Sequence, residues 1–394
     1  MGTPLWKVWN KMENNRKLRI FDSLIDVERK FLSVSFARYG NLYFTQDAFS
    51  GCEKAEIQGD VTQSMKEDVA KRFVIGPVVD RTFWHRERAS MEIDRGPWEN
   101  PQDYVRAIAQ REIAWIVRYA DLKTQHSRYS NPFTIVEPEM QRDISKHIAQ
   151  YLQLRDVAEH LLPEGEKSRA TIWHPQLSSL NMFIQEDQIT GIVDWLDVWA
   201  GPLFLQVKRP SLVRYIGELL TRLPEDYESM NEDEKMAARR QVDHSLLQIA
   251  YDARVKKRNP ILDSVNNVSQ ALNCRRAVEF AENSWGDDVI SIRQVLIRVK
   301  RHWDETHPSI QCPISFTEKE LKEHHPFVED WNASAEFFDT MHLHMGMGRD
   351  GWITANAYDD AVQLFKGAMD SVDHSGDTAE QIEDWNRKMN LLFK

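Results

Sequence analysis

The segment of this chain best suited to chemistry is TIWHPQLSSLNMF, residues 171 to 183. His174, Gln176 and Asn181 stand in it, and Asp194 follows 18 residues after Gln176, directly behind the apolar run ITGIV. Amide and carboxylate oxygens that converge on one point are ligands for Mg²⁺, which commonly bridges phosphates. The spacing is compatible with a magnesium–phosphate site at Asn181 and Asp194, and equally with Asn181 capping a turn and Asp194 accepting backbone hydrogen bonds.

A small β unit must position these side chains. RATIW, NMFIQ and QITGIVDW are three short β-rich runs with tight connections between them. A β-hairpin that turns at EDQ, residues 186 to 188, brings Asn181 and Asp194 side by side at its open end.

Most of the remaining chain has helical periodicity. Residues 18 to 37 carry apolar side chains at helical spacing, and residues 100 to 120 form a second helix with Pro101 as its first residue. Residues 138 to 162 predict a third helix, and the chain after Pro210 is predicted to be helical almost to its end. GNLYFT predicts a short strand, and residues 72 to 84 look extended around a Gly-Pro break. These patterns predict an α+β, mostly helical fold.

Composition narrows the possible functions. The chain has 394 residues and a formal net charge of −11 at pH 7, which argues against non-specific nucleic-acid binding. That charge would tolerate a cationic small substrate, although it equally serves solubility. The three cysteines form no CxxC pair, so neither a zinc knuckle nor a disulfide scaffold is indicated. The sequence has no run of 18 apolar residues, so no membrane span is expected.

A family resemblance rests on the same segments. WHPQLSSLN, ITGIVDW and GPLFLQVKRP resemble the catalytic core of the aminoglycoside phosphotransferase and choline kinase family. They look most like its large fungal branch, which includes mitochondrial-inheritance phosphotransferase proteins. YGNLYF, REIAWI, CPISFTEKEL and RDGWITANAYDDAV extend the resemblance over nearly all of the chain.

The resemblance implies the large, C-terminal lobe of the protein kinase-like fold. His174 would be the loop-stabilising histidine, and Asn181 and Asp194 would hold Mg²⁺ and the phosphates of ATP. Gln176 occupies the position of the catalytic base, where the family has an Asp. A neutral amide cannot take up a proton, and general-base assistance is worth roughly 100- to 10,000-fold in rate.

A second departure concerns the start of the chain. MGTPLWKVW resembles the segment that follows the interlobe hinge in this family. The N-terminal nucleotide lobe, with its glycine-rich loop and ATP-anchoring Lys, is therefore expected to be missing. Residues 1 to 210 are expected to form the kinase-like core, with its catalytic-type loop at 174 to 194, and residues 211 to 394 a helical extension packed on it.

Three functions are compatible with these features. The first is a degraded, pseudokinase-like protein that binds a small molecule or a protein partner in an acidic cleft. The second is an ATP-dependent phosphotransferase acting on a small-molecule hydroxyl, whose N-terminal lobe was lost from the gene model. The third is a cleft repurposed for another reaction in fungal metabolism. Mg²⁺ and ATP are expected only if the family activity is retained. A cytoplasmic location is expected, or a mitochondrial one if an N-terminal segment is missing.

Other motifs carry weaker signals. GMGRDG, residues 346 to 351, matches G-x-G-x-x-G but lacks a preceding strand, so a glycine-rich turn is expected. The histidines of HLH, residues 342 to 344, and His324 and His325 are interpreted as surface or capping residues. DRGPW, residues 94 to 98, shapes either the substrate side of the cleft or a buried Asp94–Arg95 turn with Trp98 in the core. Asp197 is either a substitute carboxylate or a solvated loop residue.

Overall fold

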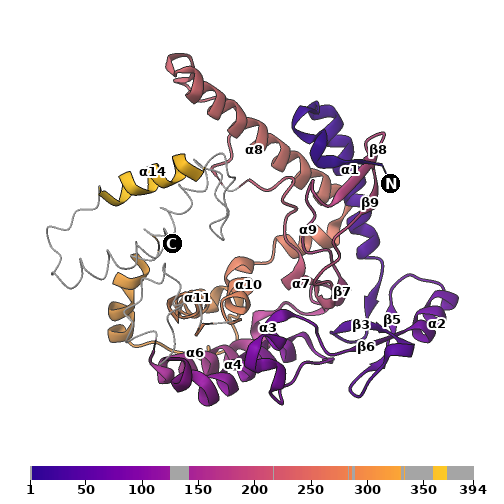
Figure 1. Ribbon diagram of the computed structural model, residues 1–394, viewed down its shortest axis with the longest axis vertical. Helices are drawn as coiled ribbons and strands as arrows, with labels where there is room; N and C mark the ends of the chain where they lie inside the picture. The colour runs from indigo at the N-terminus through magenta and orange to yellow at the C-terminus, as the bar shows by residue number, and fades with distance from the viewer. Residues whose placement is uncertain are drawn as a thin grey trace.

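The computed structural model describes residues 2–124, 142–215, 217–282, 284–285, 289–329, 332 and 358–370. Helices dominate it, and short strands form three small sheets between them (Figure 1). The predicted α+β, mostly helical class is confirmed. Whether this is the large lobe of a kinase-like fold, and whether the chain divides near residue 210, stay predictions.

The helices pack on one another and on the short strands. α4 and α6 pack along each other, and α1 packs against α8. None of the helices within the described ranges is long and apolar enough to cross a membrane. The helix bounds are α1 (Asn14–Phe31), α2 (Gln63–Arg72), α3 (Arg81–Trp84), α4 (Pro101–Thr124), α6 (Ile144–Leu161), α7 (Leu203–Gln206), α8 (Glu232–Arg258), α9 (Pro260–Asn266), α10 (Ala271–Glu279), α11 (Val289–Arg301), α12 (Trp303–Thr306) and α14 (Tyr358–Asp370).

Several predicted helix bounds need correction. α1 begins four residues before the predicted start at residue 18 and ends at Phe31, because the chain then turns to pair as a strand. The extended prediction for residues 72 to 84 holds only for the strand Phe73–Gly76, since Asp80 caps the short helix α3 by accepting the amide hydrogen of Thr82. The described residues between Pro210 and α8 form only the short 3₁₀ helix Tyr227–Ser229, and α8 begins at Glu232, where Asn231 and Glu234 form a capping box. Pro101 is the first residue of α4, as predicted.

The strands pair over long sequence distances. One sheet has the order β10-β7-β2-β5, a second β1-β8-β9 and a third β3-β6-β4, and all the pairs are antiparallel. The strand bounds are β1 (Thr3–Pro4), β2 (Ser35–Phe36), β3 (Asn41–Phe44), β4 (Glu53–Lys54), β5 (Ile57–Gln58), β6 (Phe73–Gly76), β7 (Ala170–Ile172), β8 (Met182–Gln185), β9 (Gln188–Ile192) and β10 (Ala200–Pro202).

The hairpin predicted around residues 182 to 192 is present. β8 pairs with β9 from Met182 opposite Ile192 to Gln185 opposite Gln188. Glu186 and Asp187 form the turn with φ of 50° and 63°, as a two-residue loop with a type I′ backbone requires. β1 adds a third strand to this hairpin, and its pairing with β8 was not predicted from the sequence.

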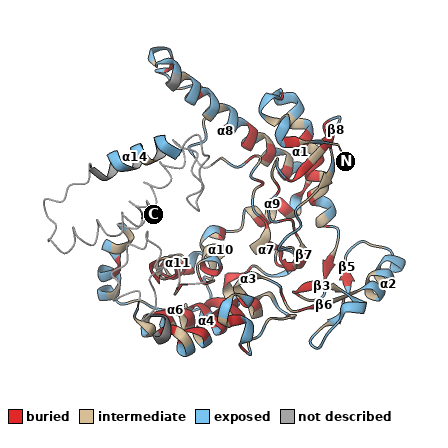
Figure 2. Cartoon of the chain, viewed as in Figure 1, coloured by how far each residue is buried: buried red, intermediate tan, exposed pale blue. Residues whose placement is uncertain are grey.

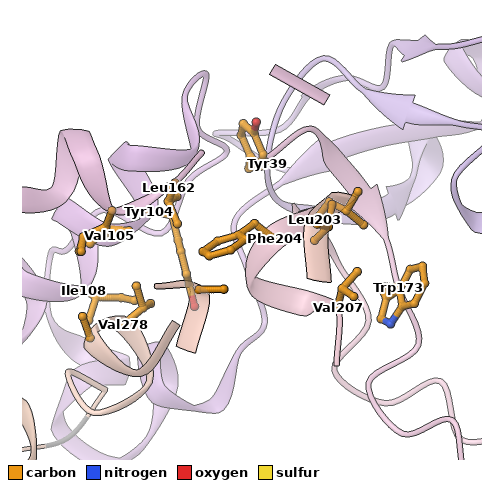
Figure 3. Close-up of a cluster of buried hydrophobic side chains, with 14 of the residues drawn as sticks. Tyr39, Tyr104, Val105, Ile108, Leu162, Trp173, Leu203, Phe204, Val207 and Val278 are labelled. Carbon is orange, nitrogen blue, oxygen red and sulfur yellow. The ribbon is translucent and has the colours of Figure 1, made fainter. Parts of the chain in front are cut away.

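A large apolar core includes buried residues from Leu5 to Ile314, and a small second cluster forms around Val289 and Ile290. Buried positions line the inner faces of the helices and the central strands (Figure 2). Phe204 of α7 lies between Tyr104 and Leu162 on one side and Leu203 and Val207 on the other (Figure 3). The short strands and α7 are thus held by the same packed interior as the long helices.

One carboxyl group is buried where α1 meets α8. Glu28 is fully buried, and its Oε1 accepts a hydrogen bond of 2.6 Å from the Tyr251 hydroxyl. Its Oε2 has no hydrogen-bond partner among the residues that the structure describes. Burial raises the pKa of Glu28 to about 8 and outweighs the opposing effect of the Tyr251 hydrogen bond. Glu28 is therefore a neutral acid in the folded protein at neutral pH.

Replacing this acid by an amide should flatten part of the pH dependence of stability. The folded-state pKa of Glu28 lies above its unfolded value. Its contribution to the free energy of unfolding is therefore fully present below the unfolded pKa and is lost as pH rises through about 8. Between these pKa values the free energy of unfolding should fall by roughly 1.4 kcal/mol per pH unit from this group. Glu28→Gln should remove that slope in urea titrations between pH 5 and 8. The exposed Glu164→Gln is the control, and equal slopes for Glu28→Gln and the unmodified chain would contradict the assignment.

Candidate functional site

The polar loop follows β7 and is organised around His174. The side chain is buried, with 1% of its surface exposed. The backbone N–H of Gln176 donates to its Nδ1 at 3.2 Å, so Nε2 carries the proton and donates to the carbonyl of Val193 at 3.0 Å. His174 thus links the loop to the end of β9, which agrees with the loop-stabilising role implied by the resemblance.

Asn181 closes the loop from the other end. Its Nδ2 donates to the Gln176 carbonyl at 3.1 Å, and its own carbonyl accepts the Val193 N–H at 3.0 Å. The side chain is 9% exposed, and its Oδ1 has no hydrogen-bond partner within the described ranges. That oxygen is therefore available to a ligand at the open end of the hairpin.

Asp194 follows Val193 and leaves the strand with φ of 66°. Its side chain is exposed and forms no ion pair with any described residue. Asp197 also has positive φ, 61°, and is exposed. Asn181 precedes β8 and Asp194 follows Val193 at the open end of the hairpin, and hydrogen bonds link His174 to Val193 and Asn181 to Gln176. Their catalytic and metal-binding roles stay predictions.

The donor set fits Mg²⁺ in part. Asn181 Oδ1 and the Asp194 carboxylate are hard oxygen donors, and Mg²⁺ typically takes one or two carboxylates, waters and substrate phosphates. The described residues contain no group of three or more His, Cys, Asp or Glu side chains that could hold a metal ion by themselves. Asn181 and Asp194 would therefore hold Mg²⁺ only together with a phosphate ligand, whose negative charge the ion would neutralise.

The side chain of Gln176 does not help to hold the loop in shape. It is exposed, whereas its backbone N–H and C=O make the two hydrogen bonds that fix the turn. A glutamine amide can donate and accept hydrogen bonds but cannot remove a proton. The loop therefore keeps its shape without a general base at position 176.

The rim of the loop is apolar. The ring of Trp195 packs edge-on against His174 with 5.1 Å between the centroids, and its Nε1–H donates to the Ile192 carbonyl at 2.9 Å. Leu180 and Leu196 are 67% and 71% exposed, respectively. Trp6, 51% exposed, donates its backbone N–H to the Ser179 carbonyl at 3.1 Å. This rim was not predicted from the sequence, and the acidic cleft stays a prediction.

Two arginines of α1 hold the hairpin turn. Asp187 accepts hydrogen bonds from Nε and Nη2 of Arg16 at 3.0 and 2.7 Å, and from Nε and Nη2 of Arg19 at 3.0 and 2.8 Å. Its side chain is 8% exposed, whereas those of the arginines are 47% and 56% exposed. The hydrogen bond from Arg16 is the main reason that the pKa of Asp187 is lowered, and Arg19 adds to this against burial. Ser23 Oγ accepts the Ile189 N–H nearby at 2.9 Å.

The other sequence candidates are structural where they are described. Trp98 is buried, as expected, and its Nε1–H donates to Asp94 Oδ2 at 2.8 Å, but Asp94 is exposed rather than buried. His324 is buried against Gln294 rather than lying on the surface, and burial lowers its pKa to about 4. The segments 342 to 344 and 346 to 351 lie outside the described residues.

Comparison with known proteins identifies fungal relatives. The chain is 24% identical over 400 residues to a subtelomeric hrmA-associated cluster protein of Aspergillus fumigatus, covering 92% of this chain and 75% of the relative. It is 22% identical over 417 residues to the mitochondrial altered inheritance of mitochondria protein 9 of Saccharomyces cerevisiae, and 23% identical over 393 residues to that of Yarrowia lipolytica. These two alignments cover 97% and 95% of this chain but 63% of each relative.

No protein-family model and no solved structure matches the chain. The homology to these relatives extends over nearly all of this chain. The names of the relatives state no reaction. The phosphotransferase resemblance therefore stays a proposal.

Removing the buried imidazole should loosen the loop. His174→Ala deletes the acceptor of the Gln176 N–H and the donor to the Val193 carbonyl. Loss of two buried hydrogen bonds should destabilise the protein by roughly 1–3 kcal/mol. Deuterium exchange in peptides spanning residues 174 to 181 should accelerate, whereas the exposed His244→Ala should leave it unchanged. Unchanged exchange in His174→Ala would show that the loop does not depend on this side chain.

Neutralising the hairpin turn should weaken its attachment to α1. Asp187→Asn should lower the free energy of unfolding by about 1–2 kcal/mol at pH 7, a modest value because both arginines are half exposed. The folded pKa of Asp187 is depressed, so its contribution is present above the unfolded pKa and disappears as pH falls through the folded pKa. The difference in urea midpoint between Asp187→Asn and the unmodified chain should therefore be smaller at pH 3 than at pH 7. Asp243→Asn, at an exposed position on α8, should show no difference at either pH.

Proposed function

We propose that this chain is a degraded aminoglycoside phosphotransferase-like protein that binds a ligand at residues 174 to 194 without transferring phosphate. The observation that carries the proposal is Gln176. It stands where the family resemblance requires a general base, while the surrounding hydrogen bonds keep the loop in an ordered turn. A loop that keeps its architecture but lacks its base is suited to binding rather than to proton abstraction.

The surroundings of the loop support binding of a partly apolar ligand. Trp6, Leu180, Trp195 and Leu196 present exposed apolar surface around it, and Asn181 Oδ1 and Asp194 offer two oxygen acceptors at the open end of the hairpin. A small molecule or a peptide with an apolar body and a cationic or hydroxyl end would satisfy both features. Exposed aromatic and aliphatic side chains beside a few aligned polar groups are common in ligand-binding sites.

An active phosphotransferase is the second candidate. Asn181 and Asp194 retain the oxygen donors that a magnesium–phosphate complex requires. The chain also spans about three-fifths of the length of the mitochondrial relatives, so an activity of the longer proteins need not reside wholly in the part represented here. In this case the ATP phosphates would be held mainly by groups outside the described residues, and Gln176 would only orient the attacking hydroxyl.

A mitochondrial location is proposed in preference to a cytoplasmic one. The relatives from Saccharomyces cerevisiae and Yarrowia lipolytica carry the word mitochondrial in their names. Import of the radiolabelled full-length gene product into isolated yeast mitochondria, followed by protease treatment, tests this directly. Complete digestion by the protease would contradict it.

Calorimetry and turnover assays test the binding proposal. This chain should show weak or undetectable ATP binding in the presence of Mg²⁺, because two protein ligands do not hold the ion tightly without further phosphate contacts. It should show no ATP turnover with amino alcohols or aminoglycosides. Micromolar ATP affinity that is lost in Asp194→Ala, or turnover by the unmodified chain, would overturn the proposal in favour of the phosphotransferase.

The variant Gln176→Asp tests whether the absence of a base at position 176 is by itself the reason for a lack of phosphotransfer. The variant should stay inactive and should be neutral or destabilised by at most about 1 kcal/mol near pH 7, because the new carboxylate lies near Asp194 on an exposed loop. The penalty should ease as pH falls and the added carboxylate is protonated, and it should vanish in the double variant Gln176→Asp/Asp194→Asn. Turnover that appears only in Gln176→Asp would show that one side chain silenced a working enzyme.

A further inference from the structure

Helix α2 lies over strands without burying a side chain. It contacts β5 and β6, and β5 is the edge strand of its sheet. Figure 1 shows α2 beside β5, at the end of the molecule that carries β3 and β6. None of its ten residues is buried, although Thr62 caps its start by accepting the Met65 N–H. Most helices in proteins are stabilised by packing an apolar face, whereas α2 packs against the core mainly through the partly buried Val69.

A hollow of about 400 Å³ lies between α2 and the neighbouring strands. Lys54, Glu56 and Ile57 line it from β4, β5 and the link between them. The helix contributes side chains three, four, seven and eight residues after Gln63, which is one helical face: Gln63, Lys66, Glu67, Ala70 and Lys71. The face of α2 turned to the strands is therefore polar and borders an open space. Such a volume is within the range of small-molecule sites, about 300–1,000 Å³.

The charges in this hollow are arranged for an anionic ligand with hydroxyl groups. Lys54, Lys66 and Lys71 form no ion pair with any residue in the part of the chain that the structure describes, although the whole chain carries a net charge of −11. The three ammonium groups outnumber the two carboxylates of Glu56 and Glu67 that line the same hollow, so its lining carries a net positive charge that favours an anion. Glu67 accepts a hydrogen bond from the Gln63 amide at 3.0 Å, and Glu56 has no ion-pair partner among the described side chains.

We propose that this hollow binds a phosphate ester of a polyhydroxyl compound, such as a sugar bisphosphate. The three ammonium groups contact the phosphates, as lysines commonly do. The carboxylates of Glu56 and Glu67 accept hydrogen bonds from hydroxyl groups, and Ile57 and Ala70 cover the carbon skeleton. None of these residues belongs to the loop at 174 to 194, so this site is independent of the function proposed above.

Ligand binding would add contacts between α2 and the strands beyond the packing of Val69. A ligand that binds only the folded arrangement of helix and strands stabilises that arrangement. Backbone amides of α2 should then exchange more slowly, because local opening of the helix requires release of the ligand. The affinity should fall as ionic strength rises, since ammonium–phosphate contacts near the surface are screened by salt.

Fructose 1,6-bisphosphate is a suitable probe. Calorimetry should show saturable binding to the full chain, and hydrogen exchange should show new protection confined to peptides covering residues 63 to 72. Fructose should not bind, and inorganic pyrophosphate should bind more weakly than the sugar bisphosphate because it cannot use Glu56 and Glu67. Lys66→Gln/Lys71→Gln should weaken the sugar bisphosphate by at least about tenfold, the equivalent of one charge-assisted hydrogen bond.

The matched control removes two exposed charges from the last turn of another helix. Lys256→Gln/Lys257→Gln on α8 changes the net charge by the same amount and should leave the affinity unchanged. Absence of binding at millimolar probe, or equal weakening by both double variants, would overturn the proposal. Equal affinity for inorganic pyrophosphate would overturn the assignment of Glu56 and Glu67 to hydroxyl groups. Circular dichroism of each variant establishes that a loss of binding is not a loss of folding.

Discussion

The contact of Asp187 with Arg16 and Arg19 fixes the position of the hairpin, and the candidate site depends on that hairpin. Val193 lies next to the open end of the hairpin. Its carbonyl accepts a hydrogen bond from His174 and its N–H donates to the Asn181 carbonyl, so both ends of the polar loop are attached to the same residue. The turn at the other end is attached to α1 by four hydrogen bonds shorter than 3.1 Å. A shift of α1 relative to the hairpin would therefore displace the loop as a unit.

Helix α1 extends this constraint to the rest of the fold. Its buried Glu28 meets Tyr251 of α8, and Phe31 at its end packs edge-on against both Trp173 and Trp195. The helix thus joins the hairpin, the loop and the long helix α8. A neutral carboxyl group at such a junction is tolerated because it is hydrogen-bonded by one oxygen and carries no charge to desolvate.

Local pattern predicted several of the elements, but not the contacts that hold them together. The hairpin from Met182 to Ile192, the start of α4 and the helical class follow from periodicity and turn residues within short windows. The two-residue strand β1 and the pairing of β2 with β7 were missed, because they are set by backbone groups that lie far apart in the sequence. The sequence contained two signals that could have identified side chains that were not predicted. Arg16 and Arg19 stand three residues apart on α1, opposite an acidic turn, and Glu28 follows Leu24 and Ile25 at the spacing of their buried stripe.

In the polar loop, the groups that determine the shape differ from the side chain that faces solvent. Its shape comes from the His174 ring, the Asn181 amide and the main chain at residue 176, whereas the side chain at residue 176 extends into solvent. Substitutions at that side chain therefore change what the loop presents to a ligand, while the hydrogen bonds that shape the turn stay in place. The chemical character of the loop surface can thus vary independently of the architecture that positions it.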